Sequence, residues 1–366
     1  MRLDVRTVRL RFAEPLRISR SVTHERDAVQ LALRHDGLTG HGEAVSSGYL
    51  RLPAELIRRT LDGLRPGLER HPDPETALTE LRLGAAPFEA LPASVLAAVE
   101  AALLDLAGKR AGRPVHRLLG RPAPVAAATA RTIGIEPPAR AAAQAARLAA
   151  AGFAVLKLKA GAADPAEDLA RVRAVRESAP GARLMLDPNG AWTPEQALRL
   201  LPAFAAAGIG AVEQPIAPGR PADLAAVAER SPVPVIADED AVGYEDACRL
   251  AGQVHGVNLK LAQCGGVHQV LRIRAALQGS GTELMLGCLA ASSLGIAPAV
   301  HLADLARWVD LDGHLLLAHD PWQGIGGADG TVRTADRAGL GVLPVAAAAV
   351  PAPAPAGPLP LPGEAR

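Results

Sequence analysis

Short clusters of ionisable residues recur at the ends of apolar runs, and their spacing is the feature that most limits the fold. The clusters are residues 157–159, 187–189, 213–215 and 238–240, followed by the single Lys260. Their charged members are 22 to 28 residues apart, about the length of one strand, one helix and two loops. Ionisable residues at the ends of successive strands are typical of an active site on a parallel β/α barrel.

From residue 129 onward, eight apolar runs alternate with Ala-rich stretches of helical spacing. We expect strands at residues 130–135, 154–159, 183–187, 211–213, 235–238, 256–260, 283–287 and 308–310. Eight such repeats favour a closed barrel over an open doubly wound sheet. The predicted fold class is therefore α/β, with a modified (β/α) TIM barrel.

A barrel of this kind needs about 250 residues. The rest of the 366-residue chain is enough for one smaller domain. Residues 2–12 and 28–34 alternate like antiparallel strands, and helical spacing follows at 92–120. We predict four parts. They are an N-terminal α+β capping domain (1–120), the barrel with the metal and acid/base site (121–315), a C-terminal segment that returns to the capping domain (316–345), and a disordered Ala/Pro-rich tail (346–366).

Composition excludes several classes of partner. A net charge of +1 provides no basic field, so nucleic acid is not expected as a partner. No run has the composition of a membrane helix, and the N-terminus lacks the apolar region of a signal peptide. Cys248, Cys264 and Cys288 show no metal-ligand spacing and are expected to be reduced thiols. The sequence therefore predicts a cytoplasmic protein without a membrane partner.

Two lysines stand in the first cluster. Strand alternation points Lys157 and Lys159 to the same side, whereas the leucines between them face the helices. Burial and like-charge repulsion both favour a neutral amine, so one of them could act as a base. A pair of surface lysines is the alternative, but the next three strand ends carry carboxylates.

Those carboxylates are Asp187, Glu213 and Asp238, on consecutive strands. They are hard oxygen ligands of the kind that Mg²⁺ prefers, and this ion keeps positions free for water or substrate. Separate ion pairs with neighbouring lysines are the simpler alternative. Three carboxylates in register favour a magnesium site.

Lys159 and Lys260 should face each other across the barrel. Lys159 ends the second strand and Lys260 the sixth, so they lie on opposite walls of an eight-stranded barrel. A substrate carboxylate on the metal would then have a lysine on each face of its α-carbon. Removal of the α-proton gives an enediolate, and a base on one face with an acid on the other inverts the centre.

Further motifs complete this pattern. They are Gly42-Glu43-Ala44, a helix at 98–109, and Pro114 followed by Leu118-Leu119-Gly120. Together with the strand-end clusters, they resemble the enolase superfamily, in its muconate-lactonising-enzyme subgroup. Three local matches are similar to dipeptide epimerases of the L-Ala-D/L-Glu type: Thr132-Ile133-Gly134-Ile135, Asn258-Leu259-Lys260-Leu261 with Cys264-Gly265-Gly266, and Asp310-Leu311-Asp312-Gly313.

This resemblance implies an Mg²⁺-dependent epimerase that inverts the α-carbon of the C-terminal residue of a dipeptide by two-base proton transfer. Lys159 and Lys260 would be the acid/base pair, with Lys157 assisting electrostatically. Asn189 and Glu239 would hold the ligands or the lysines.

The resemblance also implies how the substrate is held. Asp310 and Asp312 would bind the ammonium of the dipeptide, although an Asx-type turn before Gly313 is an alternative. Arg20, in the capping-domain loop that reads the substrate side chain, would pair with an acidic C-terminal residue. A solvated arginine in a mobile loop is the alternative for Arg20. A homo-oligomer is also expected.

The sequence also allows other functions, because it departs from the family pattern at positions expected around the pocket. Asp240 stands where serine is usual, Gln263 where lysine is frequent, and residues 287–292 lack a common acidic residue. An o-succinylbenzoate synthase, an N-acylamino acid racemase or a cycloisomerase would share the half-site, but the aspartate pair argues against them. A Schiff-base lyase and a non-catalytic binding protein are further alternatives, from other classes.

Overall fold

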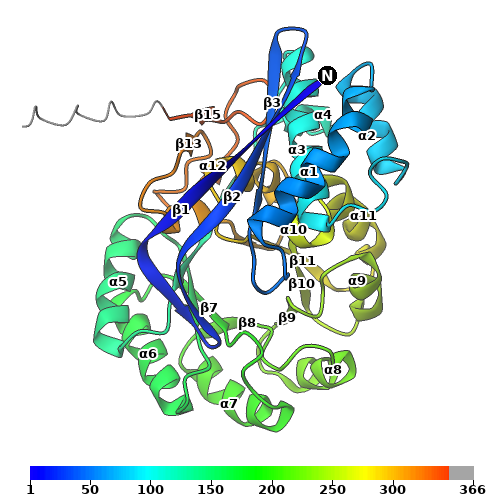
Figure 1. Ribbon diagram of the computed structural model, residues 1–366. Coiled ribbons are helices and arrows are strands. Elements are labelled where there is room, and N and C mark those ends of the chain that lie inside the picture. The colour runs from blue at the N-terminus through cyan, green and yellow to red at the C-terminus, as the bar shows by residue number, and fades with distance from the viewer. Residues whose placement is uncertain (346–366) are drawn as a thin grey trace, which may run out of the picture.

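The computed structural model describes residues 1–345, and it begins with a three-stranded antiparallel sheet (Figure 1). The strands are β1 (Arg2–Ile18), β2 (Ser21–His35) and β3 (Leu38–Val45). Helix α3 (Ala93–Arg110) packs on β3. Any side chain at Gly40 or Gly42 would collide with backbone carbonyl oxygens of this helix. The glycines of β3 therefore allow the helix to lie directly on the sheet.

Three more helices complete this N-terminal part: α1 (Ala54–Glu69), α2 (Pro74–Arg82) and α4 (Val115–Leu118). The region of helical spacing at 92–120 contains α3 and α4, separated by a turn. At the other end of the sheet, the hairpin of β1 and β2 extends to the barrel (Figure 1), where Ile135 N–H donates to the Arg17 carbonyl.

The second sheet has eight parallel strands that follow chain order from β5 to β12 and form a nearly closed barrel. They are β5 (Ala130–Ile133), β6 (Val155–Lys159), β7 (Arg183–Asp187), β8 (Ile209–Glu213), β9 (Val235–Ala237), β10 (Gly256–Lys260), β11 (Glu283–Gly287) and β12 (Trp308–Asp310). All eight predicted strands are present, with ends that agree within two residues, and the predicted fold class is confirmed.

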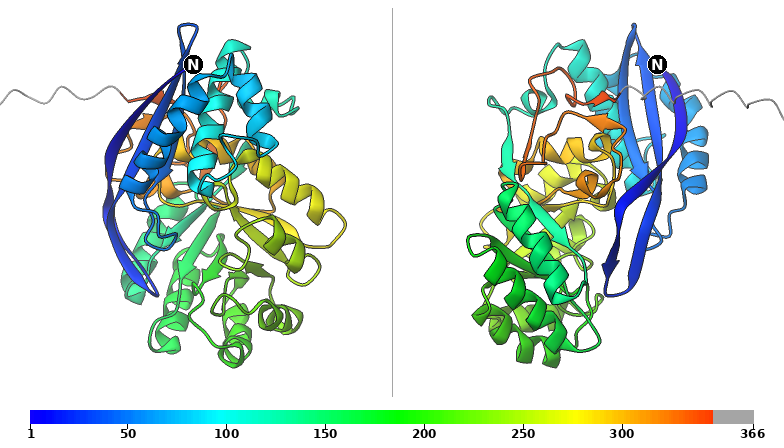
Figure 2. Two further views of the ribbon diagram at one scale, coloured as in Figure 1. Left: turned by 45° about the vertical axis from the view of Figure 1, so that its right-hand side comes forward. Right: turned by 90° about the vertical axis from the view of Figure 1, so that its left-hand side faces the viewer.

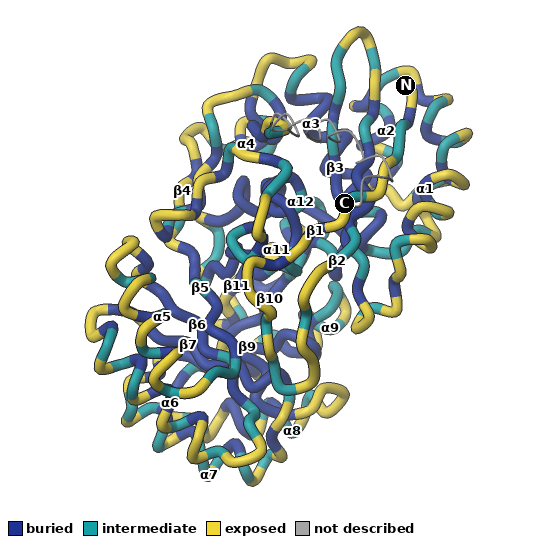
Figure 3. The backbone as a smooth tube through the Cα atoms, turned by 60° about the vertical axis from the view of Figure 1, so that its left-hand side comes forward, coloured by how far each residue is buried: buried dark blue, intermediate teal, exposed yellow. Residues whose placement is uncertain are grey.

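Helices surround these strands, and the buried residues concentrate in the strands that they enclose (Figures 2 and 3). The helices are α5 (Pro138–Ala150), α6 (Pro165–Ser178), α7 (Pro194–Ala206), α8 (Pro221–Arg230), α9 (Tyr244–Leu250), α10 (Leu261–Cys264), α11 (Val267–Leu277) and α12 (Ser293–Val300). Among the helices of residues 1–345, none combines the length and apolar character that crossing a membrane requires.

The barrel interior is layered because side chains alternate along each strand. A lower apolar layer contains Ala130, Val155, Met185, Ala211, Ile236 and Met285, with Trp308 packed against it. Two residues further along their strands, the same faces carry ionisable groups: Lys157, Asp187, Glu213, Asp238 and Asp310. The apolar layer therefore closes the barrel beneath a charged layer.

The segment after β12 runs back over the N-terminal part. Its short strands are β13 (Trp322–Gln323), β14 (Thr331–Arg333) and β15 (Leu343–Pro344); β13 pairs with β15, and β14 with β4 (Ala126–Ala128). Leu340 N–H donates to the buried carboxylate of Asp105 on α3 (2.8 Å), which also accepts from His41 N–H (2.9 Å). The predicted disordered tail, residues 346–366, lies outside the described residues.

A buried carboxylate joins α3 to the barrel. Glu100 accepts a hydrogen bond from His268 N–H (3.1 Å) in the first turn of α11. A carboxylate at this position is stabilised by unpaired N–H groups and by the helix dipole. Burial nevertheless outweighs these bonds and raises the pKa of Glu100 to about 7.

This shift predicts that Glu100→Gln becomes increasingly stabilising, relative to the wild type, as pH rises from 4.5 to 7. The native state keeps its proton up to about pH 7, whereas the unfolded chain releases it near pH 4.5, so wild-type stability falls through this window. The amide cannot ionise, so the difference in unfolding free energy between the variant and the wild type should change by roughly 3 kcal/mol across this pH window. Urea unfolding of both proteins between pH 4 and pH 8 measures this difference; parallel pH profiles would contradict the assignment.

Candidate active site

A pocket of about 520 Å³ opens at the C-terminal ends of the barrel strands, beneath the β1–β2 hairpin and the loop after β3. It is lined by most of the side chains that the sequence predicts as functional: Arg20, Lys157, Lys159, Asn189, Glu239, Lys260, Asp310 and Asp312. The three metal-type carboxylates lie buried beside it. The structure therefore brings the whole predicted set into one region.

Lys157 is the central cation of this region. Its buried ammonium lies 2.6 Å from Glu213, 2.7 Å from Asp310 and 3.2 Å from Asp187. Burial alone would lower the pKa of Lys157, but the three carboxylates outweigh it and raise the pKa well above its usual value. Lys157 is thus held as a positive charge.

Lys159 and Lys260 lie on opposite walls, because β6 and β10 are separated by three strands in the sheet order. Lys159 pairs with Asp187, and Lys260 pairs with Asp238 at 2.5 Å. Both lysines line the pocket. Burial would lower the pKa of Lys260, but Asp238 and Glu213 raise it above the ordinary range.

The carboxylates of Asp187, Glu213 and Asp238 are buried, and their pKa values shift in different directions. Burial opposes ionisation of Asp187, but Lys159 and Lys157 hold its pKa below the usual value. Burial dominates at Glu213 and Asp238 and raises the pKa of both. In this arrangement lysine ammonium groups balance the negative charge of the three carboxylates.

These side chains suit a hard divalent cation by their chemistry. In residues 1–345, no three acidic, histidine or cysteine side chains stand close enough to ligate one ion, and Lys157 lies between Asp187 and Glu213. Yet Asp238 Oδ1 is buried and has no hydrogen-bond partner among residues 1–345. A donor set of three carboxylates with one unpartnered oxygen fits Mg²⁺ by ligand type.

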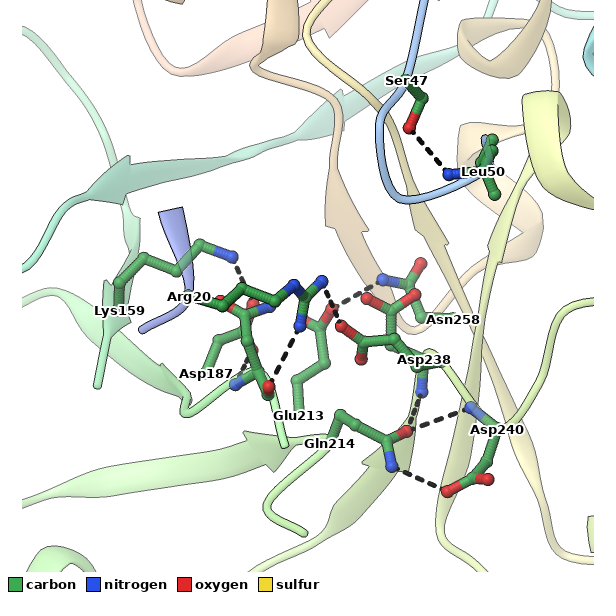
Figure 4. Close-up of polar contacts among 12 residues, drawn as sticks. Arg20, Ser47, Leu50, Lys159, Asp187, Glu213, Gln214, Asp238, Asp240 and Asn258 are labelled. Carbon is green, nitrogen blue, oxygen red and sulfur yellow. Dashed lines mark hydrogen bonds and ion pairs between the residues drawn. The ribbon is translucent and has the colours of Figure 1, made fainter. Parts of the chain in front are cut away.

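Two polar side chains support the carboxylates, and the sequence analysis assigned no role to either (Figure 4). Asn258 Nδ2 donates to Glu213 Oε1 at 2.8 Å. Gln214 Oε1 accepts from the backbone N–H groups of Asp238 (2.9 Å) and Asp240 (3.2 Å), and its Nε2 donates to Asp240 Oδ2 (2.7 Å). Gln214 therefore joins the loops after β8 and β9 and fixes Asp238.

Asn189 and Glu239 contact the site in different ways. The backbone N–H of Asn189 donates to Asp187 Oδ1 (2.9 Å), whereas its side-chain oxygen is buried and has no hydrogen-bond partner in the described part of the chain. Glu239 pairs with Arg20 at 2.7 Å, and Arg20 also donates to the Asn189 carbonyl and lies over the ring of Tyr49. Arg20 is thus tied to the barrel loops.

Asp310 and Asp312 each keep one contact to a cationic side chain. Asp310 Oδ2 accepts from Lys157, and Asp312 Oδ2 accepts from Arg131 (3.0 Å) and from Thr132 N–H (2.7 Å). Asp310 Oδ1 is buried and accepts no hydrogen bond from the residues that the structure describes. Burial raises the pKa of Asp310 to about 6 against the pull of Lys157. The aspartate pair can therefore accept a further donor from the pocket.

Comparison with known proteins agrees with this geometry. Residues 140–348 match the enolase C-terminal domain-like family, and residues 2–120 match the mandelate racemase / muconate lactonizing enzyme N-terminal domain. A hydrophobic dipeptide epimerase from Roseobacter litoralis is 34% identical over 93% of this chain and 98% of its own length. An L-Ala-D/L-Glu epimerase from Bacteroides thetaiotaomicron is 30% identical over 87% of this chain and 81% of its own length.

A solved structure is similar over the same extent. The dipeptide epimerase from Enterococcus faecalis, complexed with Mg and the dipeptide L-Leu-L-Tyr, superposes with a TM-score of 0.87. It is 29% identical and covers 93% of this chain and 98% of its own chain. The chain belongs to the enolase superfamily, in its mandelate racemase / muconate lactonizing enzyme group.

The central position of Lys157 predicts that Lys157→Met destabilises the fold by about 3–5 kcal/mol, because buried carboxylates lose their compensating charge. Urea unfolding at neutral pH measures the loss. Arg140→Met is the matched control, since Arg140 forms an exposed ion pair with Glu14, and it should change stability little. Equal effects of the two substitutions would contradict the central role of Lys157.

Proposed function

We propose that this chain is an Mg²⁺-dependent dipeptide epimerase that inverts the α-carbon of the C-terminal residue. The observation that carries the proposal is the placement of Lys159 and Lys260 on opposite walls of one pocket, with carboxylates between them. The relatives named above as dipeptide epimerases support it, as does the similar structure that holds Mg and a dipeptide.

Asp187, Glu213 and Asp238 would hold the metal, while Asn258 and Gln214 position Glu213 and Asp238. Bound Mg²⁺ would stabilise the second negative charge that develops on the substrate carboxylate and would weaken the hold of these side chains on the lysine protons. Asn189 and Glu239 act beside them, through the backbone contact to Asp187 and the ion pair with Arg20.

Lys159 and Lys260 would act on the two faces of the α-carbon. One Nζ, in the neutral amine form, takes the α-proton, and the other, as an ammonium, returns a proton to the opposite face. The two-base exchange reverses the configuration and restores the combined protonation state of the pair. Lys157, fixed between carboxylates, contributes positive charge near the reacting carboxylate and does not need to lose its proton.

The substrate would lie along the pocket from these lysines to the aspartate pair. Asp310 Oδ1, which is buried with no partner among the described residues, would accept a hydrogen bond from the ammonium of the dipeptide together with Asp312. This feature favours a dipeptide over an N-acylated amino acid, which has no free ammonium. Arg20 lines the same pocket and would contact the side chain of the C-terminal residue.

The other predictions from the sequence remain proposals. They are the division at residues 120, 315 and 345, assembly as a homo-oligomer, and a cytoplasmic location.

Incubation with a dipeptide library in D₂O should exchange the α-proton of the C-terminal residue and invert that centre, as followed by NMR and chiral chromatography. Lys159→Ala or Lys260→Ala should each lower the epimerisation rate by about 10²–10⁴-fold, because one of the two proton-transfer groups is lost. Lys109→Arg is the control, since Lys109 lies outside the pocket, paired with Asp105. Retained epimerisation in either alanine variant would refute the two-base scheme.

Removal of divalent cations with EDTA should abolish exchange, and added Mg²⁺ should restore it. Calorimetry with Mg²⁺ alone should show binding that Asp238→Asn weakens, because the substitution removes one charged ligand. Full activity after exhaustive chelation would rule out the metal-dependent mechanism.

A further inference from the structure

Arg26 is a pocket residue that the proposed mechanism does not use. It lies on β2 opposite Leu10 of β1, so it belongs to the wall formed by the N-terminal sheet. Its side chain lines the pocket, as do those of Ser47 and Cys288. This position is distinct from that of Arg20, which lies at the turn of the same hairpin.

In residues 1–345, the Arg26 guanidinium forms no ion pair and no hydrogen bond, and its Nη1 is buried without a partner. Burial lowers the pKa of Arg26, and among residues 1–345 Cys288 is the only ionisable neighbour that raises it. Burial also raises the pKa of the Cys288 thiol, so this neighbour is neutral. Within the described part of the chain, the wall therefore presents a cation without a counter-charge.

Three other arginines at the barrel are paired with carboxylates. Arg131 pairs with Asp312, Arg171 with Asp168, and Arg20 with Glu239. A partly buried, unpaired guanidinium costs free energy unless a ligand supplies acceptors. Its planar donors match a carboxylate, which can accept two parallel hydrogen bonds.

Contacts along the pocket indicate which part of a dipeptide would meet Arg26. Cys288 follows the last residue of β11, and Gly287 is in register with Asp310 of β12. A Cβ at Gly313, directly after Asp312, would lie 3.1 Å from Cys288 Sγ. Cys288 is thus adjacent to the proposed ammonium site, and it is also an ionisable neighbour of Arg26. In a dipeptide, the side chain that branches beside the ammonium is that of the N-terminal residue, so this side chain would be the substrate group nearest to Arg26.

We propose that Arg26 binds the side-chain carboxylate of an acidic N-terminal residue, so that dipeptides beginning with Glu or Asp are preferred substrates. This inference rests on the proposed dipeptide epimerase function and names its substrate class. The C-terminal residue would be set by the part of the pocket near the hairpin turn and the loop after β3, where Arg20 and Tyr49 lie.

The test compares L-Glu-L-Xaa with L-Gln-L-Xaa, where Xaa is the C-terminal residue that exchanges fastest in the library. The two substrates have nearly equal size, so the ratio of their kcat/KM values isolates the side-chain charge. The wild type should favour the Glu substrate by about tenfold or more, because hydrogen bonds to charged groups are the stronger ones. Arg26→Met should bring the ratio close to one through a raised KM for L-Glu-L-Xaa, and Arg26→Lys should restore part of the preference.

Arg11→Met is the matched control, since Arg11 lies on the neighbouring strand β1 with an exposed side chain; it should leave the ratio at the wild-type value. A wild-type ratio near one, or an unchanged ratio in Arg26→Met, would overturn the role of Arg26 and leave the epimerase function intact. If no dipeptide in the library exchanges its α-proton, the proposed function is wrong and the inference about Arg26 falls with it.

Discussion

The charge balance above the apolar layer of the barrel is the constraint on which the rest of the site depends. Strand alternation places apolar side chains in the lower layer and ionisable ones two residues further along. Isolated charges at this depth would be very costly, so each must be matched by an opposite charge or a hydrogen bond. The contacts of Lys157 with three carboxylates satisfy this requirement and fix the directions of groups from four different strands. The geometry of the lysines and carboxylates follows from this pairing as much as from the backbone.

The N-terminal part is attached by contacts that fix the upper wall of the pocket. Glu43 on β3 accepts from both the N–H and the hydroxyl group of Ser292, in the loop after β11 that lines the pocket. Glu100 binds the first turn of α11, and Arg20 binds the loops after β7 and β9. These contacts connect the sheet and α3 to strand ends on both sides of the barrel. The cap is therefore part of the active site and does more than cover it.

The barrel and its charged layer could be predicted because strand spacing and alternation leave a direct trace in sequence. The lysines carry a further signal. Among 39 lysines and arginines only four are lysines, and three of these line the pocket. Lysine can release its proton when its surroundings change, whereas arginine stays charged, so lysine suits the proton transfer proposed for Lys159 and Lys260; Lys157 is held as a cation. Asn258 could also have been placed, since it stands two residues before Lys260 and faces the same interior.

Other parts of the site leave no such trace. Gln214 has a positive backbone φ of 35°, and its side chain contacts the loop after the next strand. No periodic pattern predicts this arrangement. Asp240 stands where the family usually has serine, and its side chain accepts a hydrogen bond from Gln214. This is a tertiary contact, which the sequence alone does not show. Arg26 is one of many arginines, and only the structure shows that it lacks an opposite charge among the described residues.

The groups proposed for chemistry and those that form the outer pocket wall belong to different elements. The lysines and carboxylates proposed for chemistry stand on barrel strands, or directly after them, and parallel pairing fixes the register of these strands. The residues of the outer pocket wall stand on the β1–β2 hairpin and on loops. A substitution in the wall can therefore change its size or polarity without moving a lysine or a carboxylate. Such an arrangement allows descendants of one ancestral protein to diverge in what they accept while they inherit the same chemical step.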